Sequence, residues 1–254
     1  MGGVTIQGQG PAVVLLHSSL SSSKQWQSLV EKLAVNFTCI NIDLLGYGRA
    51  PTVSESSEYN FSTEVIRIKQ ILAKENISAP YHLIGHSCGG AIALKMAQEN
   101  SDDLFSLTLY EPVAFHLLEQ QHQHAVKFFA DSIKQENNID AAKHFVNYWN
   151  GNGYFDNLPA SVQQQMAKGM DKVNLDFNGI FAESYTLADL ADISCPSLLM
   201  LGQYTTADSK QLSEAIAKAI AQCQLTQIAA GHMGPLSHPQ LVEPVIVDFL
   251  AKQS

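Results

Sequence analysis

Gly85-His86-Ser87-Cys88-Gly89 form a G-x-S-x-G pattern, which can present a serine as a nucleophile. An apolar run precedes the pattern and a helix-period run follows it, so the spacing predicts a sharp turn between a strand and a helix. Glycines on both flanks would let the backbone lift the Ser87 hydroxyl clear of a sheet. The alternative is an ordinary glycine-rich turn in which Ser87 only caps the helix.

A histidine late in the chain can serve as the base for this serine. In "IAAGHMGPLSHP", His232 follows an apolar strand and a glycine, where it could reach across a sheet and shuttle a proton. His238 is the rival in the same loop, but its place before Pro239 favours a solvated or capping role. The remaining candidates are expected to be structural or to lie outside the site: His82, His86, His116, His122, His124 and His144.

Acyl transfer also needs two N–H donors for the developing oxyanion. The N–H of Cys88, directly after the nucleophile, is expected to be one of them. The other is expected from Ser19, in the loop of "LLHSSLSSSKQW" that links an apolar strand to the next helix. The alternative is an ordinary turn in which the serines only cap the next helix.

These residues require an alternating arrangement of strands and helices to bring them together. Short apolar runs alternate with helix-period segments, which indicates a mostly parallel sheet covered by helices on both faces. The predicted strands are 12–17, 37–43, 81–86, 104–112, 196–202 and 223–229, and the predicted helices outside the insertion are near 23–34, 62–75, 88–99, 209–221 and 238–251.

The strand pattern disappears between Val113 and Ala188. Helix-period stretches at 124–135, 140–149 and 161–170 predict a helical cap at 113–188, inserted into a core formed by 1–112 and 189–254. The insertion carries many aromatic side chains, which suit a partly apolar substrate pocket, although aromatics at helical spacing are often simply core. They are Phe115, Phe128, Phe129, Phe145, Tyr148, Trp149, Phe155, Phe177, Phe181 and Tyr185.

The order and spacing of "LLHSSLSSSKQW", "NIDLLGYGRAP", "LIGHSCGGAIAL", "PSLLMLG" and "GHMGPLSHP" resemble the α/β-hydrolase superfamily. The resemblance implies an α/β-hydrolase fold: a mostly parallel, twisted sheet of eight strands, helices on both faces, a helical cap and a Ser-acid-His triad. Two departures stand out. His17-Ser18 replaces the usual His-Gly, and the outermost strand is either absent or reduced to "VTIQ".

The resemblance also places an aspartate about three residues after the glycine of "LLMLG", but Thr205 and Thr206 stand there. Two carboxylates could replace it: Glu111 at the end of the preceding strand, which we prefer, or Asp208 further along the same loop. A buried Glu111 needs a partner, and His232 is one candidate; anchoring the first turn of the insertion is the other explanation. If Glu111 is the acid, the loop after Gly202 is expected only to pack beneath the histidine. A site with no carboxylate at all is the third alternative.

Composition narrows the classes of partner. The 254 residues, 46% of them hydrophobic, can build a sizeable core, and the net charge of -9 without a basic run gives no support for nucleic acid or an anionic membrane. The four separated cysteines favour reduced thiols and a cytoplasmic location, and no apolar run approaches the roughly 20 residues of a membrane helix. No ligand-spaced cluster predicts a metal, and no cofactor is implied. Oligomeric state is left open.

The leading hypothesis is therefore a serine hydrolase that acts on a small ester-like molecule, namely a carboxylester, thioester or lactone, through an acyl-enzyme. A C–C bond hydrolase of the same fold is an alternative. A ligand-binding or signalling homologue with weak turnover is another, because a fold does not by itself fix a function.

Overall fold

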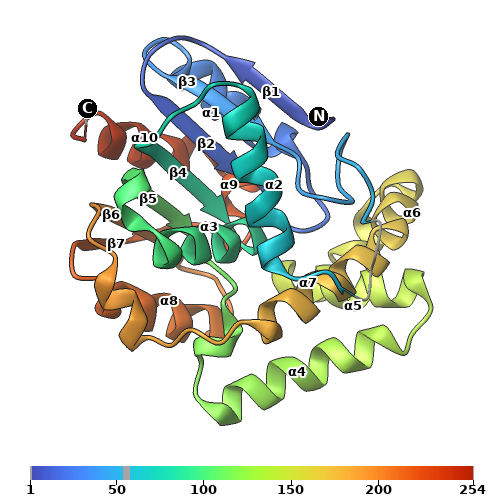
Figure 1. Ribbon diagram of the computed structural model, residues 1–254. Coiled ribbons are helices and arrows are strands. Elements are labelled where there is room, and N and C mark those ends of the chain that lie inside the picture. The colour runs from blue at the N-terminus through green and yellow to red at the C-terminus, as the bar shows by residue number, and fades with distance from the viewer. Residues whose placement is uncertain (1, 54–57, 254) are drawn as a thin grey trace.

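The core of the protein is a seven-stranded sheet in the order β1-β3-β2-β4-β5-β6-β7 (Figure 1). The structure, a computed structural model, describes residues 2–53 and 58–253. All neighbouring pairs are parallel except β1 with β3. The strands are β1 (Val4–Gln7), β2 (Ala12–Leu16), β3 (Thr38–Ile42), β4 (Tyr81–His86), β5 (Leu104–Tyr110), β6 (Ser197–Gly202) and β7 (Cys223–Ile228).

Alternate side chains of the central strands point to opposite faces of the sheet, and both faces are apolar. Helices therefore cover both faces, and each face forms its own apolar layer with them. Val14 and Leu16 of β2 belong to the layer under α2 (Phe61–Lys74), α3 (Cys88–Glu99) and α8 (Ala207–Ala219). Val13 and Leu15 belong to the layer under α1 (Gln27–Leu33) and α10 (Pro239–Leu250). In Figure 1, α2 and α3 lie in front of the sheet and α1 and α10 behind it.

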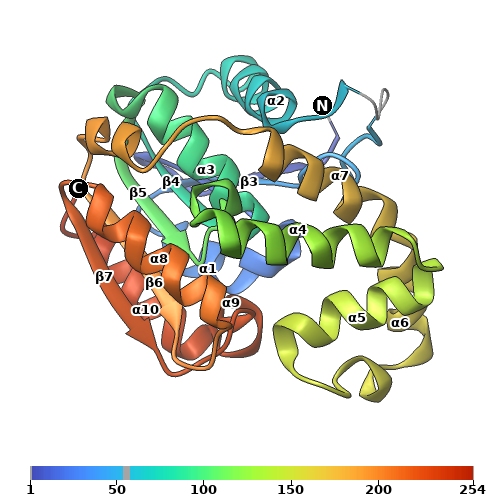
Figure 2. The same cartoon turned by 90° about the horizontal axis from the view of Figure 1, so that it is seen from below.

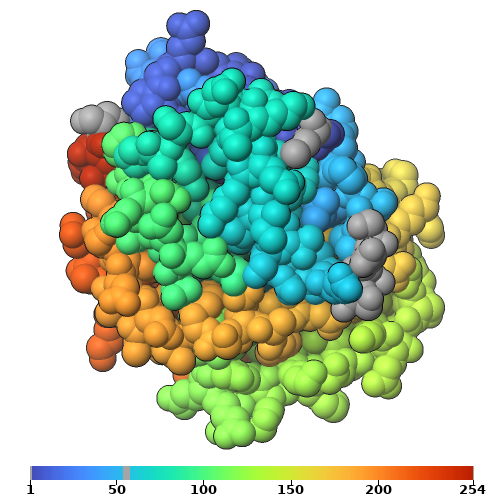
Figure 3. All heavy atoms as spheres, viewed as in Figure 1, coloured from blue at the N-terminus to red at the C-terminus, as the bar shows by residue number. Residues whose placement is uncertain are grey.

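The chain between β5 and β6 is helical throughout its described elements. It forms α4 (Gln120–Lys134), α5 (Asn138–Asn150), α6 (Ala160–Lys168) and α7 (Met170–Ala182), with short 3₁₀ turns that include η4 (Phe115–Leu117). Figure 2 shows these helices gathered to one side of the sheet, and the light-green atoms of α4 form the lower edge of the face seen in Figure 3. The helical insertion predicted from the sequence therefore consists of α4–α7 and adjoining turns.

Two expectations require correction. The sheet has seven strands rather than the eight that the resemblance implies. The described residues before β2 supply only β1, the "VTIQ" segment expected as a reduced outermost strand, which pairs antiparallel at the edge. The first predicted helix is also composite, since the 3₁₀ turn η1 (Ser23–Trp26) precedes α1.

No helix within 2–53 and 58–253 combines the length and apolar character that crossing a membrane requires.

Candidate active site

Ser87 lies at a sharp turn between β4 and α3, with φ 55° and ψ -118°. Gly85 and Gly89 make this turn sterically feasible. A Cβ on Gly85 would lie 2.4 Å from the Gly89 carbonyl oxygen, and a Cβ on Gly89 would lie 2.4 Å from the His17 oxygen. Ser87 N–H donates to the Tyr110 carbonyl at 3.0 Å, which ties the turn to the end of β5. The backbone thus holds Ser87 in a conformation that non-glycine residues adopt uncommonly.

His232 bridges Ser87 and Glu111. Its Nε2 lies 2.9 Å from Ser87 Oγ, and its Nδ1 lies 2.6 Å from Glu111 Oε2. His86 Nε2 donates to the His232 carbonyl at 2.8 Å, and the Tyr110 hydroxyl donates to the Gly231 carbonyl at 2.7 Å. These backbone contacts fix the loop that carries the imidazole.

Glu111 is buried and its backbone is unusual as well, with φ 41°. Its Oε1 accepts the Gly202 N–H at 2.7 Å, and its Oε2 accepts the Thr205 hydroxyl at 2.6 Å in addition to His232. The loop after Gly202 therefore does more than pack beneath the histidine, which corrects that expectation. It supplies the Thr205 hydroxyl as a donor to the carboxylate, beside the N–H of Gly202 at the end of β6.

Asp208, the alternative acid, does not contact His232. Its Oδ1 lies 2.8 Å from His122 Nδ1, and its Oδ2 accepts the Tyr148 hydroxyl at 3.5 Å. Asp208 stands in the first turn of α8, where a carboxylate is favoured by the helix N-terminus. Of the two carboxylates considered from the sequence, the structure brings Glu111 to the histidine and directs Asp208 toward the insertion.

The loop after β2 carries the expected second oxyanion donor, Ser19. His17 anchors this loop: its Nε2 accepts the Leu44 N–H at 2.9 Å and its Nδ1 donates to the Ser18 carbonyl at 2.7 Å. Burial lowers the pKa of His17 to about 4, so the ring is neutral at pH 7. The left-handed backbone angle in this loop lies at Leu20, with φ 55°, and not at Ser18. Replacing the usual glycine by Ser18 therefore requires no positive φ at that position.

Ser19 also joins a buried cluster of charges that the sequence did not indicate. The Ser19 and Tyr47 hydroxyls both donate to Asp176 Oδ2 at 2.6 Å. Lys172 Nζ donates to Asp176 Oδ1 and lies 3.6 Å from Glu64 Oε1. Burial alone would lower the pKa of Lys172, but the charges of Asp176 and Glu64 outweigh it and raise that pKa. Helix α7, which was not predicted as a separate helix, supplies both Lys172 and Asp176.

Cys88 begins α3 immediately after Ser87. Its side chain is 1% exposed, and burial raises the pKa of its thiol well above the usual value. A thiol that stays protonated is a weak nucleophile, so Cys88 is poorly suited to compete with Ser87. Its backbone N–H is in the first turn of the helix, where amide groups have no partner within the helix.

A small hollow, hereafter the chamber, is lined by Ser87 and has a volume of about 20 Å³. Ser19, Ser87 and Asp176 form its polar part. Its apolar lining is Val113, Phe115, Phe145, Trp149, Val173, Phe177 and Ile180. The insertion therefore supplies most of the chamber wall, and four of the ten aromatic residues considered from the sequence are in it.

Trp149 has a position that its helical spacing did not reveal. Its indole stacks on the His232 ring, with centroids 3.8 Å apart and an interplanar angle of 22°. The same side chain lines a second, larger hollow of about 210 Å³, hereafter the groove. Besides Ser19, Asn150, Tyr154 and Ser237, the groove is lined by Leu20, Phe145, Val146, Trp149, Met166, Met233 and Leu236.

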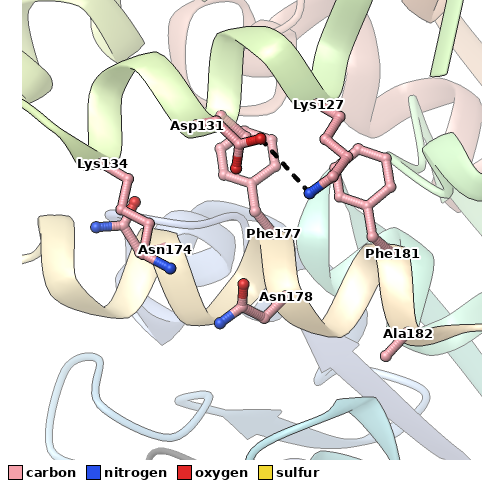
Figure 4. A pocket seen from close by; sticks show the side chains of 9 residues that line it. Lys127, Asp131, Lys134, Asn174, Phe177, Asn178, Phe181 and Ala182 are labelled. Atoms are coloured by element: carbon pink, nitrogen blue, oxygen red, sulfur yellow. Dashed lines mark ion pairs between the residues drawn. The ribbon is translucent and has the colours of Figure 1, made fainter. Parts of the chain in front are cut away.

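A third hollow of about 270 Å³ lies between α4 and α7, away from Ser87 (Figure 4). Lys127, paired with Asp131, and Lys134 face Phe177 and Asn178 across it. Phe177 lines both this hollow and the chamber, so its ring forms part of the wall between them.

His82 and the rival base, His238, make their hydrogen bonds outside this site. His82 Nδ1 lies 2.8 Å from Ser106 Oγ, and His238 Nδ1 lies 2.8 Å from Ser237 Oγ. Among residues 2–53 and 58–253, no three side chains of histidine, cysteine, aspartate or glutamate are grouped as metal ligands would be.

Comparison with known proteins gives consistent results. The profile of the alpha/beta hydrolase family matches residues 13–245. Monoacylglycerol lipase ABHD6 of Homo sapiens is 24% identical over 96% of this chain and 76% of its own length.

Two solved structures share the fold. The enol-lactonase of Burkholderia xenovorans LB400 superposes with a TM-score of 0.82 at 19% identity, covering 98% of this chain and 96% of that one. A thermophilic esterase of Thermogutta terrifontis gives 0.80 at 22% identity, covering 99% and 93%.

Proposed function

This chain belongs to the alpha/beta hydrolase family, and on that premise we propose that it is a serine hydrolase of small carboxylesters, thioesters or lactones. The observation that carries the proposal is the continuous hydrogen-bonded path from Ser87 through His232 to Glu111. A hydroxyl, an imidazole and a carboxylate in this order are the components of a nucleophilic triad.

In the proposed first half-reaction, Ser87 Oγ attacks the substrate carbonyl carbon while its proton passes to His232 Nε2. The carbonyl electron pair moves to oxygen, and Glu111 stabilises the imidazolium that forms. When the carbonyl re-forms, the bond to the leaving oxygen, or to sulfur in a thioester, breaks and His232 Nε2 gives that atom the proton. The acyl group remains on Ser87.

In the second half-reaction, water attacks the acyl-enzyme with His232 again as the base. The bond to Ser87 Oγ breaks, the proton returns to Ser87, and the free acid leaves. No cofactor is required for either step.

The proposed oxyanion hole consists of the N–H groups of Ser19 and Cys88. The Cys88 N–H at the start of α3 favours negative charge, because the first turn of a helix presents unsatisfied donors. The Ser19–Asp176 contact supports the same role, since it restrains the loop that would present the other N–H. Both donors would act where charge develops, which is where such groups lower a barrier most.

The names of the similar proteins support ester chemistry, since a lipase, a lactonase and an esterase all cleave an ester bond. We also propose residues 113–188 as a cap that closes the chamber over a core of 1–112 and 189–254. Support for this division comes from the chamber residues that α5 and α7 supply, among them Phe145, Trp149 and Asp176.

One observation favours a second candidate, a ligand-binding homologue with slow turnover. The chamber has room for about one water molecule, and Trp149 covers the His232 ring. A protein that retains a triad beneath a closed cap could bind a small molecule more efficiently than it hydrolyses one.

A fluorophosphonate probe tests the first candidate. The folded wild type should be labelled at Ser87, and Ser87→Ala should not be labelled, because the probe reacts with an activated serine. Isothermal titration with candidate esters, beside assays of their hydrolysis, separates the two candidates. Tight binding without labelling or turnover would overturn the hydrolase proposal in favour of the binding protein.

A further inference from the structure

The chamber and the groove provide very unequal space on the two sides of the reacting centre. The chamber offers about 20 Å³ and the groove about 210 Å³. They share Ser19, Phe145 and Trp149, so they are neighbours separated by side chains rather than by backbone layers. A substrate that is larger than the chamber and reaches Ser87 would extend past these shared side chains into the groove.

The position of His232 determines which part of an ester each space can receive. His232 Nε2 must protonate the leaving oxygen, so the alcohol part of the substrate lies on the histidine side of the attacked carbon. Met233, which follows His232 directly, and Leu236 of the adjoining helix α9 (Gly234–Ser237) both line the groove, so we assign the groove to the histidine side. The acyl part then faces the chamber.

The far wall of the chamber has little capacity to retreat. Phe115, Val173 and Ile180 are 1%, 1% and 3% exposed and belong to the main apolar layer of the protein. Interiors packed at this density resist the insertion of additional methylene groups. A long acyl chain therefore cannot be accommodated there without displacing core side chains.

Trp149 is the side chain that separates the two spaces. Its indole lines both of them and stacks on His232, and the residue is 9% exposed. Rotation of this indole away from His232 would connect the groove to Ser87 Oγ. It would enlarge the alcohol side and leave the far wall of the chamber unchanged.

We propose that this chain selects esters of a short acyl group with a longer apolar alcohol, the alcohol lying in the groove and Trp149 separating it from the acyl chamber. The inference rests on the proposed serine hydrolase function. It adds a substrate class and assigns Trp149 as the specificity-determining residue.

Two isomeric esters test this preference with the same atoms. Hexyl acetate carries the long chain on the alcohol, and ethyl hexanoate carries it on the acyl group. The wild type should hydrolyse hexyl acetate with a kcat/KM at least about tenfold higher, since a pocket distinguishes a few methylene groups by roughly that factor. Equal values, or a preference for ethyl hexanoate, would overturn the inference.

Two variants locate the preference. Leu236→Trp places a large ring in the groove at a position that is 45% exposed, and should lower kcat/KM for hexyl acetate about tenfold while changing ethyl hexanoate less than about twofold. Trp149→Ala joins the two spaces, so that a long acyl chain can also extend into the groove, and should bring the ratio between the isomers close to one. Phe128→Ala, at an aromatic that is 78% exposed on α4, is the matched control and should keep the wild-type ratio. A wild-type ratio in both Leu236→Trp and Trp149→Ala would contradict the assignment of the groove.

The failure of this inference is distinguishable from failure of the proposed function. If Ser87 is labelled and both esters are hydrolysed at equal rates, only the inference is wrong. If Ser87 is not labelled and neither ester is hydrolysed, the hydrolase proposal is overturned and the inference with it.

Discussion

Glu111 combines burial, backbone strain and a complete set of hydrogen-bond donors. It is 1% exposed, and its φ of 41° is a conformation that costs a non-glycine residue about 1–3 kcal/mol. Gly202 N–H, the Thr205 hydroxyl and His232 Nδ1–H all donate to its carboxylate, which offsets the loss of water. A residue keeps such a strained backbone only when its surroundings hold it there, as these three hydrogen bonds do for Glu111. The carboxylate is therefore well suited to hold the His232 ring in one tautomer.

Glu111→Gln tests this role against Asp208→Asn. The amide keeps the shape of Glu111 but cannot offset an imidazolium charge, so we expect kcat/KM to fall by about 10³- to 10⁴-fold with the fold retained. Asp208→Asn should lower it by less than about threefold, because Asp208 contacts His122 rather than His232. Ester-hydrolysis kinetics on both purified variants, with circular dichroism as the folding control, give the ranking. The reverse ranking would assign the acid to Asp208.

The sequence predicted Ser87 and His232 as partners because local rules fix the positions of both. Glycines determine the turn at Ser87, and a strand end places His232 at the edge of the sheet. No such rule predicts the contact of Asp176 with Ser19, because the two residues are 157 positions apart in the chain. The stacking of Trp149 on His232 depends likewise on how α5 lies over the sheet. Helical spacing identifies an apolar face, but it does not identify what that face covers.

At the scale of elements, α7 connects the insertion to two loops of the core. Asp176 accepts hydrogen bonds from Ser19, in the loop after β2, and from Tyr47, in the segment after β3. Lys172, one turn earlier on α7, pairs with Asp176 and lies near Glu64 of α2. These buried contacts make the position of Ser19 depend on the position of α7.

Asp176→Ala should therefore lower the free energy of unfolding by about 3–5 kcal/mol, because it leaves Lys172 without its main buried partner. Urea denaturation measures this loss. Lys143→Ala is a matched control, since it removes a surface ion pair with Asp156 and should cost less than about 1 kcal/mol. A loss of similar size in both variants would mean that the buried cluster adds nothing beyond an ordinary surface pair.

The main elements of the sheet were predictable because each central strand is an apolar run between turn residues. The apolar run of β6 and the helix period of α3 are typical of buried strands and of helices that cover them. Helix α7 was less evident, since its buried face includes Lys172 and Asp176 beside apolar residues. Polar side chains on a buried face weaken the periodic pattern. The elements least visible in the sequence are therefore those that carry buried polar contacts near the site.

At the scale of the whole molecule, the protein has a net negative charge and several deeply buried histidine side chains. The net charge is -9 at pH 7 with histidines neutral. Burial lowers the pKa of His17, His82 and His116 to about 4 each, and that of His86 well below its usual value. The folded state therefore excludes protons that an unfolded chain would accept near pH 6.5. Mild acid should destabilise the fold well before its carboxylates are protonated.

His82→Gln measures the contribution of one such ring to the pH dependence of stability. Burial lowers the pKa of His82 to about 4, so below pH 6.5 the unfolded chain binds a proton at this ring that the folded protein does not bind. The stability that the neutral ring provides is therefore fully present above pH 6.5 and is lost as the pH falls toward 4. Between pH 7 and pH 5 the variant should lose about 2 kcal/mol less unfolding free energy than the wild type, as urea denaturation at both pH values would show. His124→Gln, at an exposed position on α4, is the control and should lose as much as the wild type. If His82→Gln and the wild type lose the same amount, the ring takes up its proton in the folded state as readily as in the unfolded one.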